Sequence, residues 1–411
     1  MQAVKKVVVV GGGYAQLSLL EAFMDIPQLK ITVVDDRPRI PSREQAGISV
    51  VNIHRYNSER ITEWAKANST DYVAGSGSDK SVFIAATIAD KLNLPFYCSA
   101  AVAEMPMKKG QIQQVLREAG VPIPETMEGS DIGCFKQFLQ NACYPLVVKP
   151  DEGIGQAAVN LASCYDEAVE SLKIALSESP NGRALLQEYC DGREIGINGI
   201  VIEGEFYLLT TAFRNSSRAR GGAFGVAMEK IIIELSDTIK QGICATLTKA
   251  CNAIGIVNAP IYAQAILTKD DRVVIIEIMP RLGGGEDSRL VKLATGYDLA
   301  EATAAMSLGR KAIRPTIGSP KRTAALKFLT IPPGLIQGIS GIERAASVPG
   351  IRVVKIYYKL GQEIKQIASS RERGGYLLAE GASSDSVLTS LELAERMITF
   401  NVLPIIYDST C

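Results

Sequence analysis

Short apolar runs and helically spaced apolar positions alternate along the first part of the chain. Val7–Val10 is apolar on both faces, as a buried parallel strand requires, and Ile31–Val34 is a second run of this kind. Between them, apolar residues recur at helical spacing, namely Leu17, Leu20 and Phe23. The alternation continues through residues 72–74 and 81–92. Because strand and helix alternate, the pattern predicts an open α/β domain.

A glycine-rich turn follows the first strand. Gly11-Gly12-Gly13 precede the first helix, and Asp35-Asp36 end the second strand, which is an arrangement typical of nicotinamide or flavin binding. Gln16 occupies the position of the third glycine, so the helix cannot pack as closely on the strand as that motif requires. We interpret the turn as a tight bend that faces a substrate, with a dinucleotide-dependent oxidoreductase as an alternative.

From residue 109 onward, glycine and proline interrupt the periodic segments. An apolar helical face over 112–119 ends at Gly120-Val121-Pro122-Ile123-Pro124, which predicts a crossing between domains. A hairpin is expected to turn at Glu203-Gly204. Further strands are predicted at Leu146–Lys149, Leu185–Tyr189, Ile261–Leu267 and Arg272–Ile278, and further helices at Asp166–Leu176 and 236–254. Residues 321–411 alternate strand and helix again and contain an amphipathic helix near their end.

Composition narrows the class of protein. The chain has 411 residues, 47% of them apolar, which suits two or three domains. Lys and Arg (44) balance Asp and Glu (44), so the global charge does not attract nucleic acid or an anionic membrane. The eight cysteines form no C-x-x-C pair, a strand rather than a signal peptide begins the chain, and no apolar run has the roughly 18–20 residues of a membrane helix. The single histidine, His54, excludes histidine-based catalysis. We expect a cytoplasmic protein with small-molecule partners.

A candidate phosphate-binding segment begins at Lys149. This lysine ends an apolar strand and precedes a loop that contains Gly153 and Gly155. A lysine beside free backbone N–H groups binds polyphosphate without a Walker helix, and the loop lacks the G-x-x-x-x-G-K-[ST] pattern of a P-loop. A surface loop is the alternative.

A second candidate segment follows the strand at Leu185–Tyr189. Gln187, Glu188 and Cys190 lead into a glycine turn, and Glu194 follows it. A hinge of this shape can offer backbone N–H and C=O groups to an adenine edge and a carboxylate to a ribose diol.

The third candidate segment is Glu277-Ile278-Met279-Pro280-Arg281 with the glycines after it. A carboxylate that ends an apolar strand, followed by an arginine and Gly283-Gly284-Gly285, can hold Mg²⁺ and an anionic intermediate. Burying the acid without a partner is costly, so a cation is expected beside it. Arg371-Glu372-Arg373-Gly374-Gly375, by contrast, is interpreted as a surface turn.

The order and spacing of these segments resemble the ATP-grasp carboxylate–amine ligases, most closely the L-amino-acid ligases with a biotin-carboxylase-like C-terminal domain. The resemblance covers nearly the whole chain. It implies a Rossmann-like domain at 1–105, an ATP-grasp domain at 106–320 with its lid at about 120–190, and a closing α/β domain at 321–411.

The resemblance also implies site residues. Lys109, which precedes Leu116-Arg117-Glu118-Ala119-Gly120-Val121-Pro122, matches the first phosphate-binding lysine, with Lys108 as the fallback; Lys149 matches the second. Gly153 and Gly155 match the lid loop over the phosphates. The adenine hinge corresponds to Gln187, Glu188 and Cys190, and the ribose acid to Glu194. Arg281 and Gly283, Gly284 and Gly285 match the segment that meets phosphate and acyl substrate.

Two positions depart from the family pattern. Gln264 stands where the first metal-binding acid belongs, and Met279 replaces the customary asparagine. A thioether is a poor ligand for Mg²⁺, which prefers oxygen. We therefore expect Glu277, assisted by Gln264, to carry the protein's share of metal binding.

The implied reaction joins a carboxylate to an amine through an acyl phosphate, with ATP and Mg²⁺, or Mn²⁺, as cofactors. Lys109, Glu277 and Arg281 are the expected catalytic residues. Arg214, with Arg218 and Arg220, would hold a substrate carboxylate, although a solvated basic loop is the alternative. A small carboxylate, an amine and a second copy of the chain are the expected partners. A carboxylase of the biotin-carboxylase or purine type and a nucleotide-binding pseudoenzyme remain as alternatives.

Overall fold

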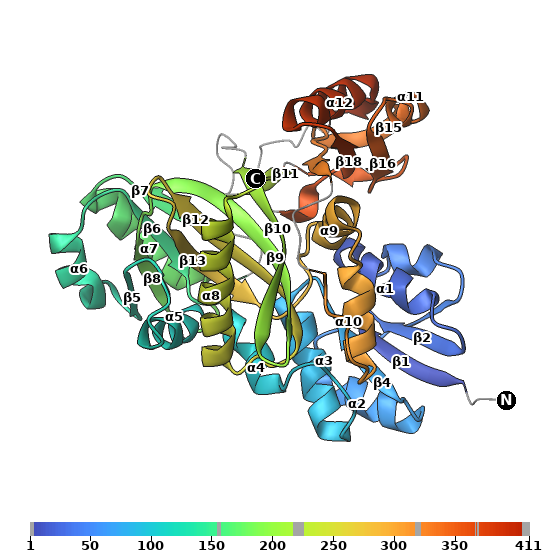
Figure 1. Ribbon diagram of the computed structural model, residues 1–411, viewed down its shortest axis with the longest axis horizontal. Coiled ribbons are helices and arrows are strands. Elements are labelled where there is room, and N and C mark those ends of the chain that lie inside the picture. Colours follow the sequence, from blue (N-terminus) through green and yellow to red (C-terminus); the bar gives the residue numbers. More distant parts are fainter. Residues whose placement is uncertain are drawn as a thin grey trace, which may run out of the picture.

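The N-terminal part of the protein is a parallel α/β layer. A computed structural model describes residues 4–153, 158–216, 226–316, 322–365, 367 and 370–404 (Figure 1). The first sheet has the order β3-β2-β1-β4, with all pairs parallel, as the apolar runs predicted. Its strands are β1 (Lys5–Val10), β2 (Leu29–Val34), β3 (Ile48–Val51) and β4 (Tyr72–Gly75). The helices of this part are α1 (Leu17–Met24), α2 (Ser58–Ala67), α3 (Asp79–Leu92) and α4 (Ala100–Glu104).

The glycine turn after β1 is held from inside the sheet. The carboxylate of Asp35 accepts a hydrogen bond from the Gly12 backbone N–H (2.9 Å) and pairs with the Arg37 guanidinium (2.6 Å). A Cβ on Gly12 would lie 2.1 Å from the hydroxyl of Ser42, so only glycine fits. Because Asp35 is fully buried and already paired, it does not present a free carboxylate to a ribose, as a dinucleotide site would require.

A second, antiparallel sheet forms a separate lobe, drawn in teal and green in Figure 1. Its order is β5-β8-β6-β7, with β5 (Thr126–Gly129), β6 (Leu146–Pro150), β7 (Asn160–Ala162) and β8 (Ala184–Glu188). Helices α6 (Lys136–Asn141) and α7 (Tyr165–Glu178) contribute to its own small core, which includes Phe135, Leu172 and Leu186. We call these residues, 126–188, the lid.

The body of the molecule is an eight-stranded antiparallel sheet of order β13-β12-β9-β10-β11-β14-β18-β16. Its strands are β9 (Gly192–Ile202), β10 (Glu205–Ser216), β11 (Ala227–Ile232), β12 (Ala259–Thr268), β13 (Val273–Met279), β14 (Thr323–Phe328), β16 (Ile351–Ile356) and β18 (Gly375–Gly381). The helices around its first half are α5 (Lys109–Glu118), α8 (Asp237–Ile254), α9 (Asp287–Thr295) and α10 (Leu299–Ser307). The predicted hairpin at Glu203-Gly204 is confirmed as the β9–β10 turn.

The sheet continues without interruption into the C-terminal residues. Strand β11 pairs with β14, which pairs with β18, and α11 (Ile342–Ala346) and α12 (Ser384–Met397) cover this end. A small sheet of β15 (Gly334–Ser340), β17 (Glu363–Ile364) and β19 (Thr399–Leu403) completes it. Short 3-10 helices lie at Tyr14–Gln16, Pro41–Glu44, Met105–Met107, Ile132–Phe135 and Ser370–Glu372. Within the described ranges, no helix has the length and apolar character needed to cross a membrane.

Candidate active site

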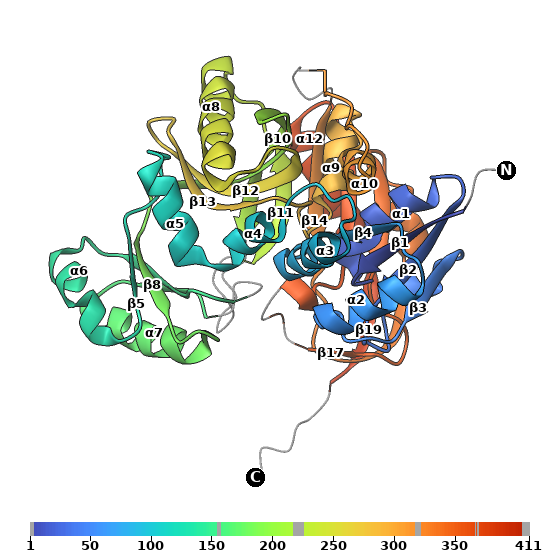
Figure 2. The ribbon, with the colours of Figure 1, turned by 90° about the horizontal axis from the view of Figure 1, so that it is seen from below.

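Strand alternation places the predicted metal ligands on one face of the central sheet. Gln264 on β12 lies directly opposite Glu277 on β13. Their sequence neighbours Ala265 and Ile278 are buried in the core that α8 covers. Because side chains alternate across a strand, Gln264 and Glu277 point to the face opposite α8, on whose side the lid lies (Figure 2). The two residues are thus brought together as expected from their spacing.

Lys149 faces this surface from the lid. It lies on β6 and is 5% exposed, and the charges of Glu277, Lys109 and Asp151 act on it. No other described residue forms a hydrogen bond or an ion pair with its ammonium. Burial lowers the pKa of Lys149 to about 8, although Glu277 and Asp151 oppose this shift. A buried amine without a partner is suited to an anionic ligand.

Lys109 is the first residue of α5 and contacts the start of the lid loop. Its ammonium donates a hydrogen bond to the backbone carbonyl of Asp151 at 2.9 Å. The Asp151 carboxylate in turn accepts hydrogen bonds from the Gly110 N–H (2.7 Å) and from Asn181 (2.7 Å). Lys108, the fallback, pairs with Glu104 instead. The loop glycine Gly153 follows directly, whereas Gly155 lies outside the described residues.

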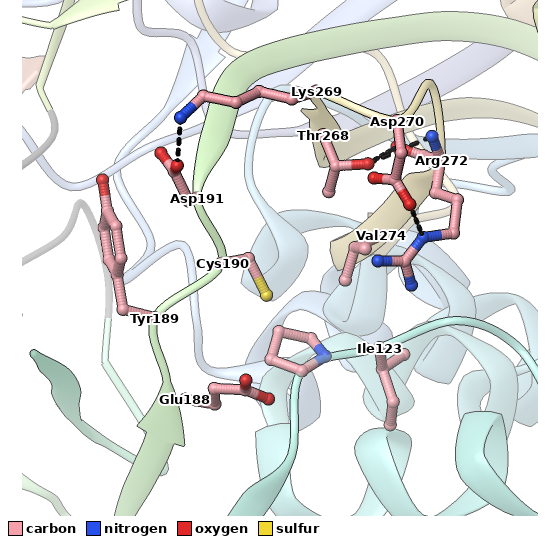
Figure 3. A pocket seen from close by; sticks show the side chains of 11 residues that line it. Ile123, Glu188, Tyr189, Cys190, Asp191, Thr268, Lys269, Asp270, Arg272 and Val274 are labelled. Carbon is pink, nitrogen blue, oxygen red and sulfur yellow. Dashed lines mark hydrogen bonds and ion pairs between the residues drawn. The ribbon is translucent and has the colours of Figure 1, made fainter. Parts of the chain in front are cut away.

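The hinge between lid and body borders a cavity of about 430 Å³. Glu188 and Cys190 line it from the hinge side, Val274 lines it from β13, and Ile123 lines it from the connecting segment (Figure 3). Val274 pairs with Ile266, two positions from Gln264, so the cavity lies at the far end of the face that carries Glu277. Ion pairs of Lys269 with Asp191 and of Arg272 with Asp270, each at 2.6 Å, form its rim.

Gln187 behaves differently from the other hinge residues. It is 2% exposed, and its side-chain amide donates to the hydroxyl of Thr126 at 2.8 Å. The amide therefore braces β8 against β5 within the lid. A contribution of Gln187 to adenine binding would have to come from its backbone.

Glu194 and Arg214, predicted for two different ligands, form one ion pair. They lie on the neighbouring strands β9 and β10, and the Arg214 side chain is 6% exposed. Burial raises the pKa of Glu194, with Arg214 acting in the opposite direction and Glu277 adding to the rise. Glu194 is therefore close enough to Glu277 to feel its charge. Arg218 and Arg220 lie outside the described residues.

Arg281 connects the end of β13 to the N-terminal layer. Its guanidinium donates to both carboxylate oxygens of Asp79, at 2.5 and 3.1 Å, where Asp79 is the first residue of α3. It also donates to the carbonyl of Leu282 (3.0 Å) and to the sulfur of Met279 (2.9 Å). Met279 thus supports the arginine. A bidentate pair of this kind fixes the plane of the guanidinium.

The glycines after Arg281 are required by close contacts. A Cβ on Gly283 would lie 2.3 Å from the carboxylate of Asp287, and one on Gly284 would lie 2.7 Å from the Gly77 carbonyl. A Cβ on Gly285 would lie 2.7 Å from the ammonium of Lys230. The segment predicted to meet substrate is therefore packed tightly against charged groups.

The sequence analysis did not identify two buried cations that lie beside Gly285. Lys230 on β11 is 3% exposed and pairs with Asp287 at 2.6 Å. It resembles Lys149, since both are lysines in an apolar strand, and that signal could have identified it. The interpretation of Arg371–Gly375 as a surface turn is wrong for Arg373, which is 7% exposed. Its burial arises from contacts with β11 and β14 that a local sequence window does not contain.

The antiparallel lid, with its buried lysine over a carboxylate-bearing face of a larger sheet, defines an ATP-grasp enzyme. Residues 108–313 match the family model described as carbamoyl-phosphate synthase L chain, ATP binding domain, and residues 327–402 match L-amino acid ligase C-terminal domain 2. The first match spans half of the chain, and the chain belongs to that family. It is an ATP-dependent ligase, which confirms the class, the fold and the resemblance expected from the motifs.

Individual relatives agree with this assignment. The chain is 25% identical to dapdiamide A synthase of Enterobacter agglomerans over 316 residues, which cover 74% of each chain. It is 23% identical to phosphoribosylamine–glycine ligase of Lactococcus lactis over 313 residues, 72% of this chain and 73% of that one. The crystal structure of L-amino acid ligase from Bacillus licheniformis superposes with a TM-score of 0.82 at 20% identity, covering 98% of this chain and 100% of that chain. The biotin carboxylase domain of Hydrogenobacter thermophilus 2-oxoglutarate carboxylase, in complex with MgADP and bicarbonate, gives 0.79 at 16% identity and covers 98% and 92%.

Proposed function

We propose that the protein joins the carboxylate of an amino acid or of a small carboxylic acid to the amine of an amino acid. ATP is converted to ADP and phosphate, and the intermediate is an acyl phosphate. The observation that carries this proposal is the buried, unpaired Lys149 opposite Glu277, because it provides a cation and a carboxylate for a metal–polyphosphate complex. The match of residues 327–402 to an L-amino acid ligase domain supports the substrate class.

ATP would lie along the face shared by the lid and the central sheet. The cavity at the hinge has apolar walls, Ile123 and Val274, and takes the adenine next to Glu188 and Cys190. From there the phosphates would extend past Glu277 to Lys149 and to Lys109 at the start of the lid loop.

Glu277 and Gln264 can supply some, but not all, of the oxygen ligands of a hard divalent cation. The carboxylate of Glu277 and the amide oxygen of Gln264 are oxygen donors on facing positions, as Mg²⁺ or Mn²⁺ prefers. In the described part of the chain, no three His, Cys, Asp or Glu side chains gather to hold a metal. Phosphate oxygens and water would therefore complete the coordination. The bound ion would neutralise charge on the transferred phosphoryl group.

The protein's own residues would act by position and charge. A carboxylate oxygen of the first substrate attacks the γ-phosphorus, and ADP leaves; the amine nitrogen then attacks the acyl carbon, phosphate leaves, and the amine loses a proton. Lys149, Lys109 and Arg281 stabilise the anionic oxygens of these steps, and the Asp79 pair keeps Arg281 oriented. The described strands of the lid, β5 to β8, would exclude water, which otherwise hydrolyses the acyl phosphate. No nucleophilic side chain takes part.

A coupled phosphate-release screen over pairs of amino acids, with mass spectrometry of the products, tests this proposal. We expect phosphate release that depends on both substrates and a product mass equal to their sum minus water. Nucleotide binding without phosphate release across the panel would instead identify a nucleotide-binding pseudoenzyme.

The structural similarity to a biotin carboxylase domain favours one second candidate, a carboxylase that activates bicarbonate. The same screen distinguishes the two reactions when bicarbonate replaces the first substrate. Phosphate release that requires bicarbonate, and no amino acid pair, would support the carboxylase. The homodimer stays a prediction for either reaction.

A further inference from the structure

Three cationic side chains are buried where β10, β11 and the turn before β18 meet. The Arg214 side chain is 6% exposed, and the residues Lys230 and Arg373 are 3% and 7% exposed. Burial lowers the pKa of Lys230 to about 8 and that of Arg373 to about 10, with the charge of Arg214 acting on both in the same direction. The three cations are therefore close enough to repel one another.

Only two of these cations have a carboxylate partner among the described residues. Arg214 pairs with Glu194 and Lys230 pairs with Asp287. Arg373 donates one hydrogen bond, from Nη2 to the Ala227 carbonyl at 2.5 Å, and its Nε is buried without a partner. Burying a charge without a compensating partner is energetically costly unless a ligand supplies that partner.

The surroundings of Arg373 hold the guanidinium in a fixed plane. Its central carbon lies 3.7 Å from the centroid of the Phe328 ring. Phe328 is 2% exposed, so the ring cannot easily move away. A planar guanidinium that is stacked on a ring and lacks a carboxylate is preorganised to bind one through two parallel hydrogen bonds.

Gly285, in the glycine segment after Arg281, lies next to two of these cations. A Cβ on Gly285 would lie 2.7 Å from the Lys230 ammonium and 3.4 Å from Nη1 of Arg373. The absence of a side chain there keeps the backbone of this segment next to both cations. The charges of Asp287 and Glu277 both act on Arg214, so Arg214 is near enough to feel a charge of this cluster and a charge of the proposed phosphate path.

We propose that Arg373 binds the anionic group that the amine substrate retains in the product. Lys230 and the backbone of Gly285 lie beside this site. This proposal rests on the proposed function. The carboxylate of the first substrate is consumed at the γ-phosphate, near Glu277 and Lys149, so it cannot compensate Arg373. An amino acid that supplies the amine keeps its own carboxylate, and that group matches the geometry of the guanidinium.

The test compares amines that differ only in the retained group. The rate constant kcat/KM is measured for an amino acid, for its amide and for the corresponding decarboxylated amine, at saturating ATP and first substrate. We expect the amino acid to be preferred by about 30-fold, the size of a charge-assisted bidentate contact. Arg373→Met should remove this preference by lowering the rate with the amino acid, while the rate with the amide changes by less than about threefold.

Arg396→Met is the matched control, because Arg396 on α12 is an arginine of the same C-terminal part with an 80% exposed side chain. It should leave the preference unchanged. Gly285→Ala is the second variant, and it should weaken the amino acid preference by displacing Lys230 and Arg373 without removing a charge. A preference for the amino acid that survives in Arg373→Met and in Gly285→Ala would overturn the proposal. An equal loss of kcat/KM with the amino acid and with the amide would overturn it too.

Hydroxylamine separates a failure of this proposal from a failure of the proposed function. It traps an acyl phosphate as a hydroxamate and carries no anionic group, so Arg373→Met should form hydroxamate at the wild-type rate. If the wild-type protein forms none with any carboxylic acid, the proposed function is wrong. If amines that carry a phosphate ester in place of the carboxylate are preferred through Arg373, the site binds a retained anion but the carboxylate assignment is refuted.

Discussion

ATP affinity should decrease with rising pH because Lys149 loses its proton in the free protein. Burial lowers the pKa of this lysine to about 8, and only the charged form attracts polyphosphate. With that pKa, the protonated fraction falls from about 0.76 at about pH 7.5 to about 0.09 at about pH 9, so the affinity should fall about eightfold over this range. Above about pH 7.5 the charge of ATP itself changes little.

The assay is isothermal titration calorimetry with a non-hydrolysable ATP analogue and Mg²⁺ at several pH values. Buffers of different ionisation enthalpy also report the proton taken up on binding. Lys149→Arg should bind with an affinity that is nearly independent of pH, because a guanidinium stays charged throughout the range. Lys173→Arg, on the exposed surface of the lid, should retain the wild-type decrease. A wild-type affinity that is constant with pH, or a decrease that persists in Lys149→Arg, would refute the assignment.

The remaining predictions concern the metal, the ion pair of Arg281 with Asp79, and the central sheet. Glu277→Ala should abolish ATP-dependent product formation in the coupled assay; retained turnover would contradict its metal role. Asp79→Ala should lower the free energy of unfolding by about 2 kcal/mol in urea, since it leaves the buried Arg281 guanidinium unpaired while Asp79 itself is partly exposed, and a change below about 0.5 kcal/mol would show that the pair contributes little. Gly199→Ala should destabilise the protein by about 2–3 kcal/mol, because the new methyl would lie 2.3 Å from a phenylalanine ring. Gly242→Ala in α8, where nothing lies within 4 Å, is its control and should be neutral or stabilising by about 0.5–1 kcal/mol.

Local periodicity was sufficient to predict most individual elements. The buried strands of the first sheet, the β9–β10 hairpin and the pair β12–β13 follow directly from runs and turns in the sequence. The pairing of β11 with β14 could not be predicted in this way, because strands separated by about 90 residues leave no common periodic signal. The domain boundaries and the assignment of individual site residues stay predictions.

The candidate site residues also divide into those marked by their local sequence and those buried by distant residues. Lys149 and Glu277 were identifiable, since a charged residue that interrupts an apolar strand is conspicuous in the sequence. Arg373 was misinterpreted because its neighbours are polar and glycine-rich, while the groups that bury it, Ala227 and Phe328, are distant in the chain. The side chain of Gln187 points into the lid because β5 presents a hydroxyl to it, which strand periodicity alone does not reveal.

The unbroken sheet from β13 to β16 has a consequence for substrate size. The strand that carries Glu277 and the turn that carries Arg373 are joined by rows of backbone hydrogen bonds rather than by a linker. The spacing between the proposed place of acyl activation and the proposed anchor of the second substrate is therefore set by strand geometry, at about 4.8 Å per strand. The two proposed sites thus restrict the length of an amine substrate that can reach both.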